Sequence, residues 1–223
     1  MVFPEPDGPM TATNLPAGMV KVDQSFIGDI LDDPEDLAIL DGVLSLAGAF
    51  GREVIAEGVE TIAHGDMLLG IGCDLAQGYG IAHPMPADRI PAWVNEWQPP
   101  AHWTDLARIH REAMPLMYAA VAHRAWVMRA EAYLQGQTSQ PPLLAEDRDG
   151  FVRGLERAGS RRVDEAEALL QRHQEVHDLA GELFALRERG EDSRALARLH
   201  ELHAARDRLL DELSAYLHSV HAG

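Results

Sequence analysis

The sequence is poor in cysteine, in positive charge and in long apolar runs, and each shortage narrows the range of functions. Cys73 is the only cysteine, so no disulfide can form within the chain. Lysine and arginine number 19 against 36 aspartates and glutamates, and the net charge of −17 opposes binding to the phosphates of DNA or RNA. No apolar run approaches the ~20 residues that cross a bilayer, and the N-terminus lacks a secretion signal. These shortages predict a cytoplasmic protein that binds neither nucleic acid nor membrane.

The first half of the chain alternates between strand and helix patterns. Residues 1–16 contain four prolines and no apolar period, which predicts an irregular segment. After it, Asp33 and Thr61 are placed to cap two helices, each followed by a strand pattern. The predicted strands span 19–23, 53–57 and 75–79, and the predicted helices span 34–50 and 61–71. Because strand and helix alternate, the strands are expected to pair in parallel.

A proline-rich stretch at 84–100 separates this region from one that shows helical periods alone. The boundary is predicted near Pro99–Pro100, which gives an α/β domain at 17–98 and an all-α domain at 101–221. A long helix is expected to start at Thr104 and to be kinked by Pro115. Ser193 is expected to cap the last helix. Short connections between the helical segments predict an antiparallel four-helix bundle.

Polar side chains stand at or just beyond the end of each predicted strand. Lys21 and Asp23 close the first strand, Glu57 and Glu60 the second, and Gln77 the third. Taken singly, each is typical of a solvated or loop residue. Enzymes built as (β/α) barrels, however, keep their chemistry at the carboxyl ends of parallel strands, so the group as a whole predicts a site.

Four motifs in this region resemble the EAL-type cyclic-di-GMP phosphodiesterases. They are Lys-Val-Asp-Gln-Ser-Phe-Ile at 21–27, Glu-Gly-Val-Glu-Thr at 57–61, Gly-Cys-Asp-Leu-Ala-Gln-Gly-Tyr at 72–79 and Ala-His-Pro-Met-Pro at 82–86. The resemblance covers roughly residues 15–97. It implies that this domain is a partial (β/α) barrel, made of about the last three strand–helix units.

The same resemblance implies hydrolysis of cyclic di-GMP to its linear dinucleotide with the help of Mg²⁺ or Mn²⁺. Carried over by position, Lys21 would lie beside the metal-bound water and Glu57 would be the general base. Asp23, Glu60 and Gln77 would support the metal and the substrate. The chain contains no Glu-Ala-Leu in a first-strand context and no Asp-Asp-Phe-Gly loop before Lys21. We therefore expect most metal ligands to be missing and the chain itself not to hydrolyse cyclic di-GMP.

Histidines in the helical half provide candidate metal ligands. His173 and His177 lie four residues apart, so both imidazoles project from one face of a helix. His200 and His203 form a rival pair at a spacing of three residues. Either pair alone is more often a polar stripe on a helix than a metal site.

The first histidine pair belongs to a longer pattern that resembles the chemoreceptor zinc-binding (CZB) domain. The pattern consists of His123-x-x-Trp126, Asp147 three residues before Gly150, and His173-x-x-x-His177. The resemblance implies one Zn²⁺ held by His123, Asp147, His173 and His177 in a four-helix bundle. Asp147 stands where that family has a cysteine. Exchanging a thiolate for a carboxylate is expected to weaken the preference for zinc and removes thiol redox chemistry.

Two interpretations follow from these resemblances. In the first, the chain is the C-terminal portion of an EAL phosphodiesterase that acts on cyclic di-GMP and carries a zinc-responsive regulatory bundle. In the second, it is a non-enzymatic metal sensor or dimerisation protein that keeps a degenerate EAL remnant. A homodimer through the bundle is compatible with both.

Overall fold

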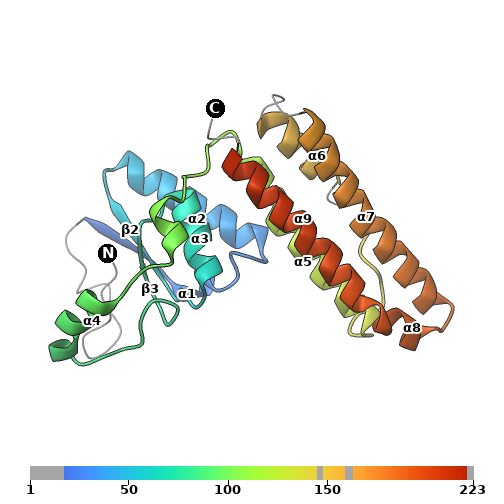
Figure 1. The fold of residues 1–223 in the computed structure, drawn as a ribbon, viewed down its shortest axis with the longest axis horizontal. Helices are drawn as coiled ribbons and strands as arrows, with labels where there is room; N and C mark the ends of the chain where they lie inside the picture. Colours follow the sequence, from blue (N-terminus) through green and yellow to red (C-terminus); the bar gives the residue numbers. More distant parts are fainter. Residues whose placement is uncertain (1–17, 145–147, 159–162, 220–223) are drawn as a thin grey trace. The chain divides into compact units, whose positions relative to one another are not determined.

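A computed structural model describes residues 18–144, 148–158 and 163–219 (Figure 1). The chain divides into two compact units, a sheet unit at Met1–Ile109 and a helical unit at His110–Gly223. The division lies between Ile109 and His110, downstream of the Pro99–Pro100 pair. The segment at 1–16, predicted to be irregular, lies outside the described residues.

The sheet unit is built on three parallel strands, β1 (Met19–Val22), β2 (Glu53–Glu57) and β3 (Leu75–Gln77), in the order β1-β2-β3. Val22 pairs with Ala56, and Ala56 with Ala76. All three residues are buried, so this row of the sheet faces the core. The strand positions and the parallel pairing agree with the prediction. A sheet of this kind with its helices is compatible with part of an EAL barrel.

Local signals in the sequence set the helices of the sheet unit. α1 (Gln24–Ile27) is a single turn, α2 (Pro34–Ala49) begins after Asp33, and α3 (Ile62–Ile71) begins after Thr61. The Asp33 carboxylate accepts a hydrogen bond from the Glu35 N–H at 2.8 Å, and Thr61 caps α3 in the same manner. Gly72 ends α3 with a φ of 89°, a left-handed conformation that favours glycine. Leu40 of α2 and Leu68 of α3 are buried in one core with Val54 and Ala56 of β2.

The residues after β3 form η1 (Ala87–Arg89), α4 (Ile90–Glu96) and η2 (Ala101–Thr104). The segment 101–109 then runs along α3. The Trp103 indole N–H donates to Asp66 at 2.5 Å and packs over Gly65, and the Ile109 N–H donates to the Gly70 carbonyl at 2.7 Å. The predicted long helix from Thr104 is therefore wrong at its start, because these residues are tied to α3 as an irregular strap.

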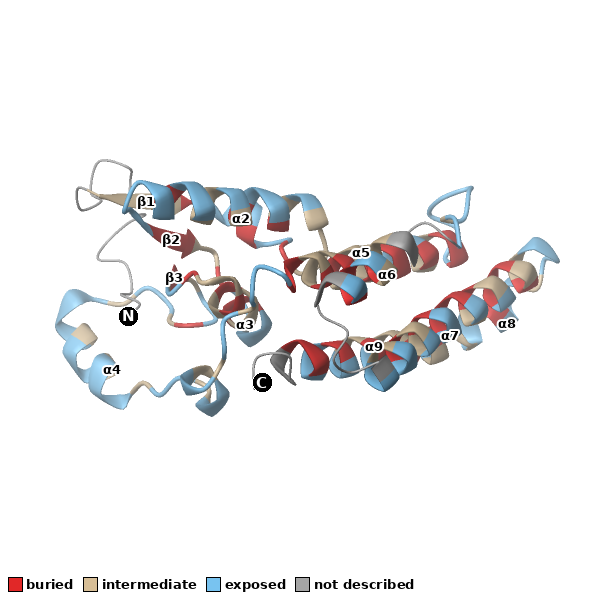
Figure 2. Ribbon diagram, turned by 90° about the horizontal axis from the view of Figure 1, so that it is seen from above, coloured by how far each residue is buried: buried red, intermediate tan, exposed pale blue. Residues whose placement is uncertain are grey.

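The helical unit contains α5 (Met114–Leu134), α6 (Arg148–Ala158), α7 (Val163–Glu188), α8 (Asp192–Ala197) and α9 (Leu199–Ser219). α5 packs on α6, α7 packs on α9, and α5 also contacts α7 and α9. Buried positions recur along the whole length of α5 (Figure 2). They include Trp126, Val127 and Leu134, and Leu183 of α7 and Leu209 of α9 are buried as well.

Two details of the helical unit correct the sequence-based expectations. Pro115 lies in the first turn of α5, where its missing N–H has no helical partner to lose, so it starts the helix instead of kinking it. The last helix is not continuous from Ser193, because it is broken at Arg198 into α8 and α9. The Arg198 guanidinium binds Glu201 of α9 and Glu182 of α7, both at about 3 Å, and these contacts hold the bend. Among the described residues, no helix is both long and apolar enough to cross a membrane.

Candidate functional site

Three of the predicted site residues meet at the carboxyl ends of the strands. Side chains alternate along a strand, and the register places Lys21, Glu57 and Gln77 on the same face of the sheet. The Lys21 Nζ atom lies 2.5 Å from Glu57 Oε1, and the Gln77 amide nitrogen donates to the same oxygen at 2.5 Å. The Lys21 and Glu57 side chains are 18% and 14% exposed, and Gln77 is buried. Lys21 is the only lysine of the chain.

Asp23 and Glu60 occupy different positions from this cluster. Asp23 caps α1, with its carboxylate accepting the Ser25 N–H at 2.9 Å. Hydrogen bonds from Ser25 lower the pKa of Asp23 below its ordinary value, and the charge of Lys21 adds a smaller effect in the same direction. The Glu60 side chain is exposed. Among the described residues, Asp23, Glu57 and Glu60 are not part of a converging group of three or more possible metal ligands.

Two glycine-containing loops hold the cluster in place. The Val59 N–H donates to the Gln77 carbonyl at 3.0 Å, and the Gly80 N–H donates to the Val59 carbonyl at 2.8 Å. A Cβ atom at Gly78 would clash with the backbone of Val59, and Gly78 has a φ of 156°. Because the loops after β2 and β3 approach this closely, the Glu57 and Gln77 side chains meet. This role of the glycines was not predicted from the sequence, although the pattern Gln-Gly-Tyr-Gly at 77–80 signals it.

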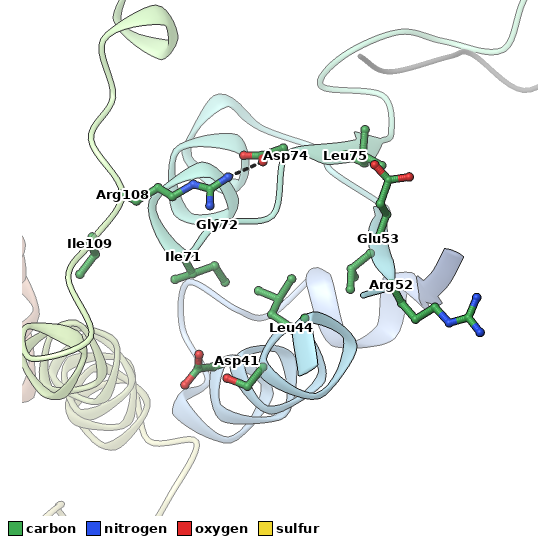
Figure 3. Close-up of a pocket in the computed structure, with 13 residues that line it drawn as sticks. Asp41, Leu44, Arg52, Glu53, Ile71, Gly72, Asp74, Leu75, Arg108 and Ile109 are labelled. Carbon is green, nitrogen blue, oxygen red and sulfur yellow. Dashed lines mark hydrogen bonds and ion pairs between the residues drawn. The ribbon is translucent and has the colours of Figure 1, made fainter. Parts of the chain in front are cut away.

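A pocket of about 450 Å³ lies elsewhere in the sheet unit, between α2 and α3 (Figure 3). Arg52, Glu53 and Leu75 line it at the amino ends of β2 and β3. Arg108 of the strap reaches toward Asp74 and forms an ion pair with it. The pocket is therefore at the opposite end of the strands from Lys21, Glu57 and Gln77.

Comparison with known proteins finds similarity in the first part of the chain. Residues 8–84 match the EAL domain. The oxygen sensor protein DosP of Escherichia coli K12 is 37% identical over 86 residues, which are 39% of this chain and 11% of DosP. The bifunctional diguanylate cyclase/cyclic di-GMP phosphodiesterase MucR of Pseudomonas aeruginosa is 38% identical over 80 residues, 36% of this chain and 12% of MucR.

The cyclic di-GMP phosphodiesterase RocR of the same organism is 37% identical over 71 residues, 32% of this chain and 18% of RocR. The chain thus spans less than a fifth of the length of each of these curated relatives. No solved structure matches. The EAL match ends at residue 84, so the helical unit lies outside it.

Three histidines converge in the core of the helical unit. His123 comes from α5, and His173 and His177 come from α7. The three residues are 0%, 2% and 4% exposed, and one ligand atom of each lies within 4.8 Å of the others. The Nε2 atoms of His173 and His177 are 3.2 Å apart. Two nitrogens bound tetrahedrally to zinc at 2.0–2.1 Å are roughly 3.3 Å apart, so the pair fits such an ion.

The rival pair, His200 and His203, does not join this cluster. Asp147 lies outside the described residues. His200 donates to the Ala197 carbonyl at 2.9 Å on the surface, and His203 lies 3.0 Å from Glu131. The structure therefore separates the rival pair from the converging group.

Aromatic side chains enclose the three imidazoles. The Trp126 ring centroid lies 4.1 Å from that of His177 and 6.0 Å from that of His123. Phe151 of α6 stacks on His173 at 4.5 Å with an interplanar angle of 20°. The Trp126 indole N–H also donates to the Leu143 carbonyl at 2.9 Å. Phe151 was not anticipated, because its contact with His173 depends on how α6 packs and leaves no local pattern.

Proposed function

We propose that the chain acts in cyclic-di-GMP signalling, as the C-terminal portion of an EAL-type phosphodiesterase joined to a zinc-binding helical unit. The main support is the Lys21–Glu57–Gln77 cluster, which lies at the strand ends where barrel enzymes keep their chemistry. The EAL match at 8–84 and relatives named as cyclic di-GMP phosphodiesterases support the same substrate.

Within this proposal, the sheet unit recognises the dinucleotide but does not hydrolyse it unaided. Lys21 supplies a positive charge for a phosphate oxygen, and Gln77 holds the Glu57 carboxylate in position. Because Asp23, Glu57 and Glu60 are not part of a converging group of possible metal ligands among the described residues, Glu57 lacks the partners that a general base on a metal-bound water requires.

Titration calorimetry of the full chain with cyclic di-GMP and Mg²⁺ tests binding, and chromatography of the nucleotide tests hydrolysis. We expect binding that weakens about tenfold in Lys21→Met, and no product above background with either Mg²⁺ or Mn²⁺. Arg89→Met is the matched control, because this arginine is exposed on η1. No binding by the wild-type chain contradicts the proposal, and so does metal-dependent turnover that disappears in Glu57→Ala.

For the helical unit we propose one zinc ion per chain, held by His123, His173, His177 and Asp147 in a four-helix bundle. The buried, converging imidazoles support it. When bound, zinc would tie α5 to α7 and so stabilise the packing of the unit. The same histidine cluster supports the rival function, a metal sensor or dimerisation protein without nucleotide binding. Light scattering with and without a chelator tests whether metal also controls a homodimer.

A further inference from the structure

One helix of the sheet unit is apolar on its outer side as well as on the side that faces the core. From Ala38 to Phe50, α2 and its cap contain a single charged residue, Asp41. A helix that is apolar all round is normally covered on all sides. Leu46 is nevertheless 62% exposed and Phe50 is 72% exposed. The outer side of α2 therefore has the composition of an interface.

The apolar residues on this outer side have the spacing of a seam between two helices. They are Ile39, Val43, Leu46 and Phe50, which we call the α2 stripe. Their successive spacings of four, three and four residues are those of the a and d positions of a coiled coil. Val43 is partly buried and the other three side chains are exposed. The α2 stripe thus matches the surface that one helix presents to another.

The α2 stripe points away from α3, toward the edge of the sheet. The residues of α2 that line the pocket beside α3 are Asp41, Leu44, Ser45 and Gly48. At 3.6 residues per turn, these residues and the α2 stripe lie on opposite sides of the helix. The strand order is β1-β2-β3, and among the described residues β1 pairs only with β2. The outer edge of β1 and the α2 stripe therefore lie on the same side of the sheet unit.

A second copy of the chain can cover both features through one twofold axis. Neighbouring strands lie about 4.8 Å apart, so pairing β1 with its copy would join the two sheets edge to edge. Leu40 and Ala47 of α2 share a core with Val22 of β1 and Val54 of β2, so α2 lies over these two strands. The two copies of α2 would then be roughly 10 Å apart, and packed helices have axes 8–10 Å apart. The same symmetry therefore brings both surfaces into contact.

The charges at the two ends of α2 are complementary in an antiparallel pair. Glu35 and Asp36 lie in its first turn, and burial together with nearby carboxylates raises the pKa of Asp36. Arg52 follows the other end and points away from the pocket (Figure 3). A Cβ atom at Gly18 would lie 3.1 Å from the Arg52 guanidinium, which places this charge at the start of β1. Arg52 of one copy can thus neutralise the acidic end of α2 in the other.

We propose that the α2 stripe and the outer edge of β1 form the interface of a homodimer in which the two copies of α2 pack antiparallel. In this register Ile39 of one copy faces Phe50 of the other, and Val43 faces Leu46. The interface belongs to the sheet unit alone, so it requires neither metal nor nucleotide. It is distinct from a homodimer through the helical unit.

Sedimentation equilibrium of the full chain in the presence of EDTA is the first test. Because the interface is small, we expect a dimer with a Kd on the order of 10 μM. Leu46→Glu combined with Phe50→Glu should weaken the dimer by about 100-fold or more, since it places carboxylates in the seam. Ile62→Glu is the matched control, because Ile62 is 52% exposed on α3, and it should leave the Kd within about threefold. Circular dichroism checks that each variant folds.

A charge exchange tests the pairing of the helix ends. Arg52→Glu should weaken the dimer by about tenfold, because it replaces two attractive contacts across the twofold axis by repulsive ones. Glu35→Arg in the same chain should restore the Kd to within about threefold of wild type. Failure of the second substitution to restore dimerisation would reject the role of Arg52.

Disulfide trapping tests the antiparallel register in a Cys73→Ala background, which removes the native thiol. Copies with Ile39→Cys mixed with copies with Phe50→Cys should form a disulfide between chains under mild oxidation. Neither variant should do so alone, since identical end residues are roughly 16 Å apart along antiparallel helices. Trapping of each variant with itself, and not of the mixture, would overturn the register.

The remaining outcomes separate a second copy from other partners of the α2 stripe. A monomer at every concentration overturns the inference, and an unreactive thiol in its Leu46→Cys variant would show that another part of the same chain covers the α2 stripe. A dimer that survives Leu46→Glu with Phe50→Glu, or that dissociates on addition of EDTA, places the interface elsewhere and also overturns it. None of these results depends on nucleotide or zinc binding.

Discussion

The two polar clusters of this chain differ in how they handle charge. Lys21, Glu57 and Gln77 form a charged, partly exposed group that hydrogen bonds hold at the ends of strands. His123, His173 and His177 form a cluster fully buried among aromatic rings. The first arrangement suits an anion that arrives from solvent, and the second suits a cation that becomes enclosed. The charge and burial of a polar cluster thus decide the sign of the charge on the ligand that it can accept.

The distribution of charge along the chain sharpens this contrast. Residues 1–109 carry four lysines and arginines against seventeen aspartates and glutamates, whereas residues 110–223 carry fifteen against nineteen. Most of the net negative charge is therefore in the sheet unit. A phosphodiester that approaches this unit meets net repulsion, and Lys21 is the local exception.

Replacing Trp126 should have the largest effect on stability. Trp126→Ala removes a fully buried indole and its hydrogen bond to Leu143, so we expect a loss of ~3–5 kcal/mol in the free energy of unfolding of the helical unit. Met128→Ala on the same helix is the control, because Met128 is 50% exposed and its replacement should change stability by less than ~0.5 kcal/mol. Urea unfolding followed by circular dichroism compares the two, and equal effects would show that Trp126 is not part of the core.

Replacing one histidine should separate the buried cluster from the surface histidines. His173→Ala should reduce zinc affinity by roughly 100-fold or more, because it removes one of the two ligands that α7 supplies and leaves three of the four proposed protein ligands. His200→Ala should leave zinc affinity within about twofold, since His200 binds a carbonyl on the surface. Calorimetry with Zn²⁺ on the full chain measures both. A comparable loss in the two variants would contradict the assignment of the ligands.

A pair of glycine substitutions tests whether close loop approach builds the sheet-unit cluster. Gly78→Ala should cost ~2 kcal/mol or more and weaken the Lys21–Glu57 contact, because the added methyl group meets the Val59 backbone. Gly48→Ala, on α2 with open space around it, should instead stabilise by up to ~1 kcal/mol. Thermal unfolding of both variants is the measurement. A neutral Gly78→Ala would show that the loops can separate without loss.

The smallest expected effect concerns the pH dependence that Asp23 contributes. Its pKa is lowered in the folded chain, so its contribution to stability is present above its unfolded value of ~3.9 and disappears as pH falls through the lower folded value. Asp23→Asn should therefore flatten the acid limb of the stability curve below about pH 4 and leave the curve near pH 7 parallel to wild type. Unfolding at a series of pH values checks this, with Asp88→Asn as the surface control.

Local signals predicted most of the sheet unit. Asp33 with Pro34 and Thr61 with Gly72 are short-range caps, and the structure places both helices within a residue of the prediction. The meeting of Lys21, Glu57 and Gln77 also follows from strand alternation. The predictions that failed concern segments whose structure depends on partners far away in the sequence. Thr104 and its neighbours read as helical but are held along α3, and Arg198 breaks a continuous apolar row because Glu182 lies across from it.

The candidate metal ligands could be identified from the sequence, whereas the aromatic residues around them could not. His173 and His177 share a helix face, so their spacing is visible in the sequence. His123 was found only through a resemblance, and Phe151 was missed, because contacts between α5, α6 and α7 depend on packing that no local pattern specifies.

The single lysine of the chain has a consequence for proteolysis. A protease that cleaves only after lysine has one target in all 223 residues, the Lys21–Val22 bond inside β1. That bond is paired with β2 and can enter a protease only when the strand detaches. The rate of this single cut therefore reports how often β1 opens, and a ligand that engages Lys21 or Glu57 should slow it in proportion to its occupancy.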